Sequence, residues 1–237
     1  MANNVICYFI LLNKNEMPKT KIAGVGYYVP KNVVTNNDLL QYISKPLIIP
    51  FLAGYFWVQT NFIANKIKKW IFFALFFSWA GDILLMFVPT NDNFFLFGLA
   101  SFLVAHIFYI VFFHHVRVKE NIQSNLWLLI VVVVYYVALI TWLSPYLDDM
   151  KLPVRIYGVV ISVMLMLAMH MLSLKNKIAG NWMMWGAVLF VISDSVLAIN
   201  KFYQPFEAAN VIIMLTYGLA QLFIVTGAIR YLQSVNS

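Results

Sequence analysis

"WIFFALFFSWAGDILLMFVP", residues 70–89, decides the fold class of this chain because it is continuously apolar over a membrane-spanning length. A helix of about 20 apolar residues crosses the roughly 30 Å hydrocarbon core of a bilayer. The run carries Leu, Phe and Met on every face and lacks the two-residue alternation of a barrel strand. It nevertheless contains a carboxylate, Asp82, which makes that residue a candidate for function.

The rest of the chain repeats this pattern. Composition is 62% hydrophobic and 11% charged, against about 45–50% and about 25% in soluble domains. We predict an all-α, polytopic membrane helical bundle over 43–237, with short connections. Its seven predicted transmembrane helices are 43–60, 70–89, 94–115, 126–145, 153–174, 182–200 and 208–230.

The basic residues that give the net charge of +7 lie at helix ends and in short loops. We therefore expect them to set the membrane topology and not to bind nucleic acid. With a cytoplasmic C-terminus, eight basic residues fall inside: Lys66, Lys68, Lys69, Arg117, Lys119, Lys175, Lys177 and Arg230. The outer connections hold three, Lys151, Arg155 and Lys201. This asymmetry predicts a cytoplasmic C-terminus, and we expect an integral membrane protein of the bacterial inner membrane.

Residues 1–42 differ from the bundle. The phrase "MPKTKIAGVGYYVPKNVVTNNDL" (17–39) is β-branched and punctuated by turn residues. It resembles the extreme N-terminus of the 3-oxoacyl-carrier-protein synthase III family, but none of that family's catalytic positions follows. We expect 1–42 to be a non-membrane leader, foreign to the bundle, in place of an original first helix.

Two pairs of predicted helices look like copies of each other. "SWAGDILLMF" (78–87) and "FVISDSVLAI" (190–199) each carry one Asp at a similar depth, and "AHIFYI" (105–110) and "AQLFIV" (220–225) follow them. A four-helix unit repeated twice would give parallel repeats about an axis along the membrane normal. We therefore predict such a repeat.

A set of polar residues falls in the same slab of the predicted bundle. At about 1.5 Å per residue, Asp82 and Asp194 both lie roughly 18 Å from the inner helix ends. Buried carboxylates are costly, so we predict both to be catalytic. We expect substrate-binding roles for neighbours on the same faces or at the same depth: Lys45, Ser78, His106, Tyr109, Ser193, Tyr217 and Gln221. Hydrogen bonding between helices remains the structural alternative for each.

Other chemistries have little support in the sequence. Three converging metal ligands are not evident, and the membrane part has no phosphate loop, nucleophile elbow or dinucleotide-binding glycine pattern. We predict no metal and no cofactor. We interpret His170 as a hydrogen-bonded bundle histidine and His114-His115 as interfacial. The oligomeric state stays open.

Five ordered motifs resemble the YhhN family of membrane proteins: "KPLIIP" (45–50), "SWAGDILLM" (78–86), "GLASFLVAHIFY" (98–109), "SDSVLA" (193–198) and "YGLAQ" (217–221). The resemblance runs from about residue 40 to residue 230. The family is usually eight-helical, and its animal members are lysoplasmalogenases. It implies a membrane hydrolase that cleaves the vinyl ether bond of a lysoplasmalogen, a lysophospholipid, giving a fatty aldehyde and a glycerophospho head group.

Two carboxylates suit such a reaction. A vinyl ether hydrolyses by proton transfer to its β-carbon, and water then captures the oxocarbenium ion. Burial and mutual repulsion keep one carboxyl protonated as the acid, while the other stays ionised and activates water. Which aspartate plays which role is left open by the sequence. The alternative function is a proton-coupled transporter or lipid carrier that uses the same aspartates as a proton relay.

Overall fold

The computed structural model describes the backbone of residues 36–236 and the side chains of 46–236. The predicted leader, 1–42, lies largely outside the described residues and stays a prediction, as does the role of the Lys45 side chain. The described part contains α-helices joined by short turns and no strands, which confirms the predicted all-α class. Its α-helices are α2 (Asn36–Thr60), α3 (Lys68–Met86), α4 (Asn93–Lys119), α5 (Leu126–Leu143), α6 (Lys151–His170), α7 (Lys177–Ala198) and α8 (Ala209–Asn236).

Six of these helices are long and apolar enough to cross a membrane, the spans that begin with α3, α4, α5, α6, α7 and α8. The predicted first span, 43–60, falls within α2, whose described apolar part, Pro46–Thr60, is shorter than a crossing. Short 3-10 turns, Ser144–Tyr146, Asp148–Met150 and Met171–Ser173, join α5 to α6 and follow α6. A π-helix, Ile199–Tyr203, extends α7.

Side chains of loop residues fix where two helices begin. The Asn125 side chain accepts a hydrogen bond from the backbone N–H of Trp127 at the start of α5 (3.0 Å). In the same way Asn176 accepts from Ala179 N at the start of α7 (3.1 Å). Such caps satisfy backbone donors that the first helical turn leaves unpaired.

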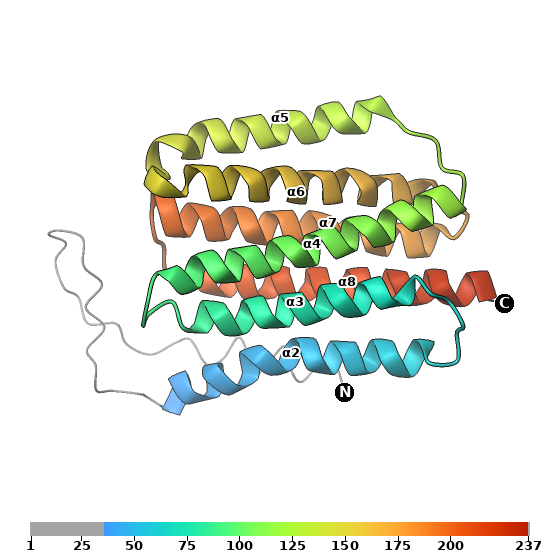
Figure 1. Cartoon of the computed structure of the whole chain (residues 1–237), viewed down its shortest axis with the longest axis horizontal. Helices are drawn as coiled ribbons and strands as arrows, with labels where there is room; N and C mark the ends of the chain where they lie inside the picture. Colours follow the sequence, from blue (N-terminus) through green and yellow to red (C-terminus); the bar gives the residue numbers. More distant parts are fainter. Residues whose placement is uncertain (1–35, 237) are drawn as a thin grey trace, which may run out of the picture. The chain divides into compact units, whose positions relative to one another are not determined.

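The bundle is formed by antiparallel pairs of sequential helices and by α4 and α6, which run parallel to each other (Figure 1). α3 packs along α4, α7 packs along α8, and α6 contacts α4, α5 and α7 (Figure 1). The two closest pairs, α3–α4 and α7–α8, are those predicted to be copies, although the repeat itself stays a prediction. α5 lies at the edge against α6 and is mostly exposed, with Trp127 73% and Val134 63% accessible. Such large exposed apolar side chains are compatible with contact to lipid.

The α7–α8 seam is made close by small residues. A Cβ added at Gly186 would lie 2.8 Å from the backbone N of Ile224, and one at Gly227 would lie 2.8 Å from the backbone O of Ala179. Small residues let helix backbones approach in membranes, where dispersion contacts drive association. The seam therefore fixes how α7 and α8 present their polar side chains.

Candidate active site

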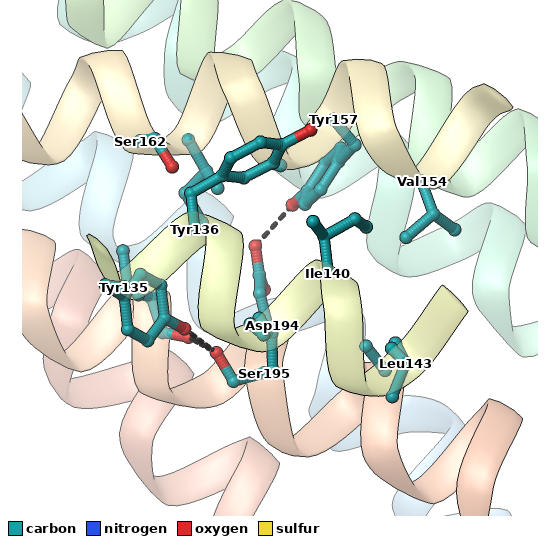
Figure 2. Close-up of a pocket in the computed structure, with 14 residues that line it drawn as sticks. Tyr135, Tyr136, Ile140, Leu143, Val154, Tyr157, Ser162, Asp194 and Ser195 are labelled. Atoms are coloured by element: carbon teal, nitrogen blue, oxygen red, sulfur yellow. Dashed lines mark hydrogen bonds between the residues drawn. The ribbon is translucent and has the colours of Figure 1, made fainter. Parts of the chain in front are cut away.

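Asp194 of α7 is the centre of the first polar group. The Tyr157 hydroxyl, from α6, donates a hydrogen bond to Asp194 Oδ2, and His106 Nε2, from α4, lies 3.9 Å from the same oxygen. The His106 side chain is fully buried, and that of Asp194 is 14% exposed. Figure 2 shows Asp194 reaching up from α7 to the Tyr157 hydroxyl. Three helices thus converge on one carboxyl group.

The hydrogen bonding of His106 defines its tautomer. Its Nδ1 lies 2.7 Å from the backbone O of Phe102, and a carbonyl oxygen can only accept, so Nδ1 carries a proton. In the neutral ring Nε2 then presents a lone pair. Nε2 is buried and has no hydrogen-bond partner in the described part of the chain. A buried polar atom of this kind needs an explanation, and a reacting molecule beside Asp194 would supply one.

A small cavity of about 50 Å³ opens beside Asp194 between α5, α6 and α7. That volume accommodates a few water molecules beside the carboxyl group. Most of its lining is aliphatic or aromatic, and the Tyr135 hydroxyl hydrogen-bonds the Ser195 hydroxyl at its edge (Figure 2). Its lining residues are Tyr135, Tyr136, Leu139, Ile140, Leu143, Val154, Tyr157, Gly158, Ile161, Ser162, Val191, Asp194, Ser195 and Ala198.

A smaller pocket, about 30 Å³, lies against the same carboxyl group from the α4 side. It shares Val154, Tyr157, Asp194 and Ala198 with the larger pocket. Its other lining residues are Phe95, Leu99, Leu197 and Phe202. The Asp194–Tyr157 pair therefore borders two small, mainly apolar hollows.

A second polar group joins α3, α4 and α8. The Tyr217 hydroxyl donates to Asp82 Oδ2 over 2.8 Å. One turn further along α8, Gln221 accepts a hydrogen bond from the Tyr109 hydroxyl at 2.5 Å and donates to Ser78 Oγ at 3.0 Å. Ser78, Tyr109 and Gln221 are all buried. These contacts pair residues that are far apart in the sequence, as interhelical hydrogen bonds do.

Phe190 of α7 touches both groups. Its ring centroid lies 4.7 Å from that of His106 and 5.5 Å from that of Tyr217, both in edge-to-face geometry. Such aromatic pairs are favourable beyond the area they bury. A packed path therefore runs from Asp82 through Tyr217 and Phe190 to His106. Asp82 lines neither of the two pockets described above.

The structure distributes the predicted site residues among these groups. Asp194 and His106 come together, as do Asp82 and Tyr217, and Ser78, Tyr109 and Gln221 form one hydrogen-bonded set. Ser193 instead donates to the backbone O of Ile213 on α8 at 3.1 Å. The catalytic and binding roles themselves stay predictions.

Sequence reasoning missed Tyr157, Tyr135 and Ser195. A hint was present for Ser195, which directly follows Asp194, whereas Tyr157 stands in an apolar run with no polar neighbour on its face. The interpretation of His170 is confirmed, since its Nε2 accepts from Asn125 N and its Nδ1 lies 2.7 Å from the Met166 carbonyl oxygen.

Fold and site together define a polytopic helical membrane protein with a carboxyl–imidazole–phenol group buried beside apolar pockets. The chain belongs to the YhhN family, whose model it matches over residues 40–228. It is 34% identical over 194 residues to human lysoplasmalogenase TMEM86B, an alignment that covers 79% of this chain and 75% of that protein. It is 31% identical over 218 residues to the lysoplasmalogenase of Mycobacterium bovis, covering 86% and 80%. Human lysoplasmalogenase TMEM86A is 30% identical over 181 residues, covering 73% and 71%. No solved structure matches the chain.

Proposed function

We propose that this protein is a lysoplasmalogenase, a membrane hydrolase that splits the vinyl ether bond of a lysoplasmalogen into a fatty aldehyde and a glycerophospho head group. The names of its relatives support the reaction, and one structural observation supports the location of the active site. That observation is the Asp194 carboxyl group, which lines both apolar pockets and is held by Tyr157, with the buried His106 Nε2 lying 3.9 Å from it.

The proposed reaction begins with proton transfer from the Asp194 carboxyl group to the β-carbon of the vinyl ether. The double-bond electrons take up that proton, and the α-carbon becomes an oxocarbenium ion beside the new carboxylate, which stabilises it. Water adds to the α-carbon and loses a proton. The resulting hemiacetal breaks its bond to the glycerol oxygen, giving the aldehyde and a free hydroxyl, and the released proton restores the acid.

His106 is the proposed acceptor of the proton from water. With Nδ1 protonated toward the Phe102 carbonyl, the Nε2 lone pair is available as a base. Nε2 lies 3.9 Å from Asp194 Oδ2, so in this proposal the water that attacks is held at the carboxyl group close to the base. Tyr157 is the proposed positioning residue that keeps the carboxyl group turned toward His106.

Asp82 has a different proposed role. Its contact with Tyr217, and the packing of Tyr217 on Phe190 and of Phe190 on His106, suit a residue that positions the base from a distance. We place the remaining predicted residues with it, as the polar frame that fixes α3, α4 and α8: Ser78, Tyr109, Ser193 and Gln221. Lys45 keeps its predicted role in substrate binding.

The proposed substrate is a lysophospholipid in the bilayer, with its alkenyl chain among the apolar pocket walls. We place the protein in a bacterial inner membrane with its C-terminus in the cytoplasm. The charge asymmetry supports this orientation, with eight basic residues on the proposed inner side and three on the outer side. The pockets then lie in the outer half of the bundle.

Purified protein in detergent tests the proposal. We expect release of a fatty aldehyde from an alkenyl-glycerophosphoethanolamine, and in ¹⁸O-labelled water the glycerol product should carry no label because the bond breaks on the alkenyl side. Label in the glycerol hydroxyl would contradict the mechanism. Movement of intact lysolipid across liposomes without aldehyde formation would favour the carrier instead.

A further inference from the structure

Lys201 lies on the π-helix Ile199–Tyr203, which continues α7 directly beyond Asp194. Its Nζ stands 5.1 Å from the centroid of the Phe95 ring and 3.6 Å from Asp92 Oδ1, both at the beginning of α4. The side chain is 36% exposed. π-helical turns interrupt α-helices frequently at functional sites. This one places a cation over an aromatic ring at the end of the bundle.

The ring beneath Lys201 belongs to the wall of the smaller pocket. Phe95 lines that pocket together with Phe202, the residue next to Lys201, and Asp194 lines it as well. Phe95 and Phe202 pack edge to face with their centroids 5.7 Å apart. One apolar hollow thus extends from the reacting carboxyl group to the ring that carries the ammonium group.

The spacing along α7 matches the spacing of groups in a lysophospholipid. Asp194 and Lys201 are seven residues apart along α7 and the π-helix that follows it, an axial rise of about 10 Å between their backbones. In the lipid about seven covalent bonds separate the vinyl ether β-carbon from the phosphorus atom, or roughly 9 Å when extended. A lysophospholipid that lies along this stretch is therefore long enough to reach from Asp194 toward Lys201.

The ion pair between Lys201 and Asp92 is weak. Asp92 is 91% exposed, and an ion pair between solvent-exposed side chains contributes little net stability. A phosphate brings negative charge and several acceptor oxygens to the same ammonium group, and lysine is a frequent phosphate ligand.

We propose that Lys201 binds the phosphate of the lysophospholipid while its vinyl ether lies at Asp194. The inference rests on the proposed function and names the residue that selects a phospholipid as substrate. The head group would lie at the end of the bundle and the alkenyl chain inside it. An alkenylglycerol without phosphate should be a poorer substrate for this reason.

Kinetics with two substrates test the proposal. Lys201→Gln should raise KM for alkenyl-glycerophosphoethanolamine about tenfold, with kcat within about twofold, and should leave KM for alkenylglycerol unchanged. Lys151→Gln removes an exposed cation from the same end of the bundle and should change neither KM. Equal changes for both substrates, or none for the phospholipid, would overturn the proposal.

Two further variants separate phosphate binding from a structural role. Lys201→Arg keeps the charge and should keep KM for the phospholipid within about threefold. Asp92→Asn removes the ion pair but leaves the cation, so KM should stay the same or fall. A rise in KM with Asp92→Asn as large as that with Lys201→Gln would show that the ion pair, and not the phosphate, is what Lys201 serves.

Binding without turnover distinguishes failure of this inference from failure of the proposed function. A non-hydrolysable 1-O-alkyl-lysophosphatidylethanolamine should raise the melting temperature of the wild-type protein more than 1-O-alkylglycerol does. Lys201→Gln should abolish that difference even if no aldehyde is ever released. An undiminished difference would refute phosphate binding by Lys201, and an equal rise with inorganic phosphate would refute its assignment to the lipid.

Discussion

Replacement of Gly227 by Ala is expected to weaken the α7–α8 seam on which the candidate site depends. An added Cβ would lie 2.6 Å from Met183 Cγ and 2.8 Å from both Ala179 O and Met183 N. The side-chain carbon can move, but the two backbone atoms can reach ordinary contact only if the helices separate by roughly 0.6 Å. The substitution therefore destabilises the protein by loosening the packing between α7 and α8 around this position.

The magnitude follows from the dispersion energy lost along that seam. A gap of this size removes about a quarter to a half of a contact energy of about 0.1–0.2 kcal/mol per atom pair. If roughly 30 pairs are affected, the free energy of unfolding falls by about 1.5 kcal/mol, within the usual range of about 1–3 kcal/mol for overpacking. This corresponds to about a tenfold change in the unfolding equilibrium.

Equilibrium unfolding in mixed detergent and SDS micelles, followed by circular dichroism, measures the effect. Gly218→Ala is the matched control, because Gly218 lies on the same helix and an added Cβ meets no atom within 4 Å. We expect the control to be neutral or more stable by at most about 1 kcal/mol. If Gly227→Ala is as stable as Gly218→Ala, the close approach of α7 and α8 is not what the structure describes.

Three further substitutions address the site, each measured as aldehyde release from a lysoplasmalogen beside a melting curve. Tyr157→Phe removes the donor to Asp194 and should lower kcat about tenfold, with stability lowered by no more than about 1.5 kcal/mol; unchanged kcat would exclude its positioning role. His106→Gln should lower kcat about 100-fold because the proposed base is lost; a fold-change below about three would remove His106 from the mechanism. Asp82→Asn keeps an acceptor for the Tyr217 hydroxyl and should retain more activity than Asp82→Ala; equal loss in both would indicate that the charge of Asp82 takes part directly.

The sequence predicts the helices well because lipid leaves the backbone few choices. A chain without water around it must satisfy its N–H and C=O groups within each crossing, so a long apolar run becomes a helix. Asp194 stands out for the same reason, since a carboxylate inside such a run is costly. These two signals are local, and the predicted spans after the first overlap α3 to α8 closely.

The partners of each polar group depend on how the helices are rotated, which packing decides. Ser193 and Asp194 are adjacent and therefore about 100° apart on α7, so they cannot point the same way. Because α7 packs against α8, Ser193 faces α8 and donates a hydrogen bond to the Ile213 carbonyl oxygen. Asp194 then faces α6 and accepts a hydrogen bond from Tyr157. Sequence reasoning could not single out Tyr157, because its polar partner, Asp194, lies 37 positions away in the sequence.

Steady-state hydrolysis of a lysoplasmalogen by Asp194→Asn is the measurement that bears most directly on the proposed mechanism. An amide has the shape of the carboxyl group but cannot deliver its proton, so we expect kcat to fall about 100-fold to 10,000-fold with little change in melting temperature. Asp92→Asn, which alters an exposed aspartate, should keep full kcat. A folded Asp194→Asn protein that releases aldehyde within about threefold of the wild-type rate would show that the acid lies elsewhere.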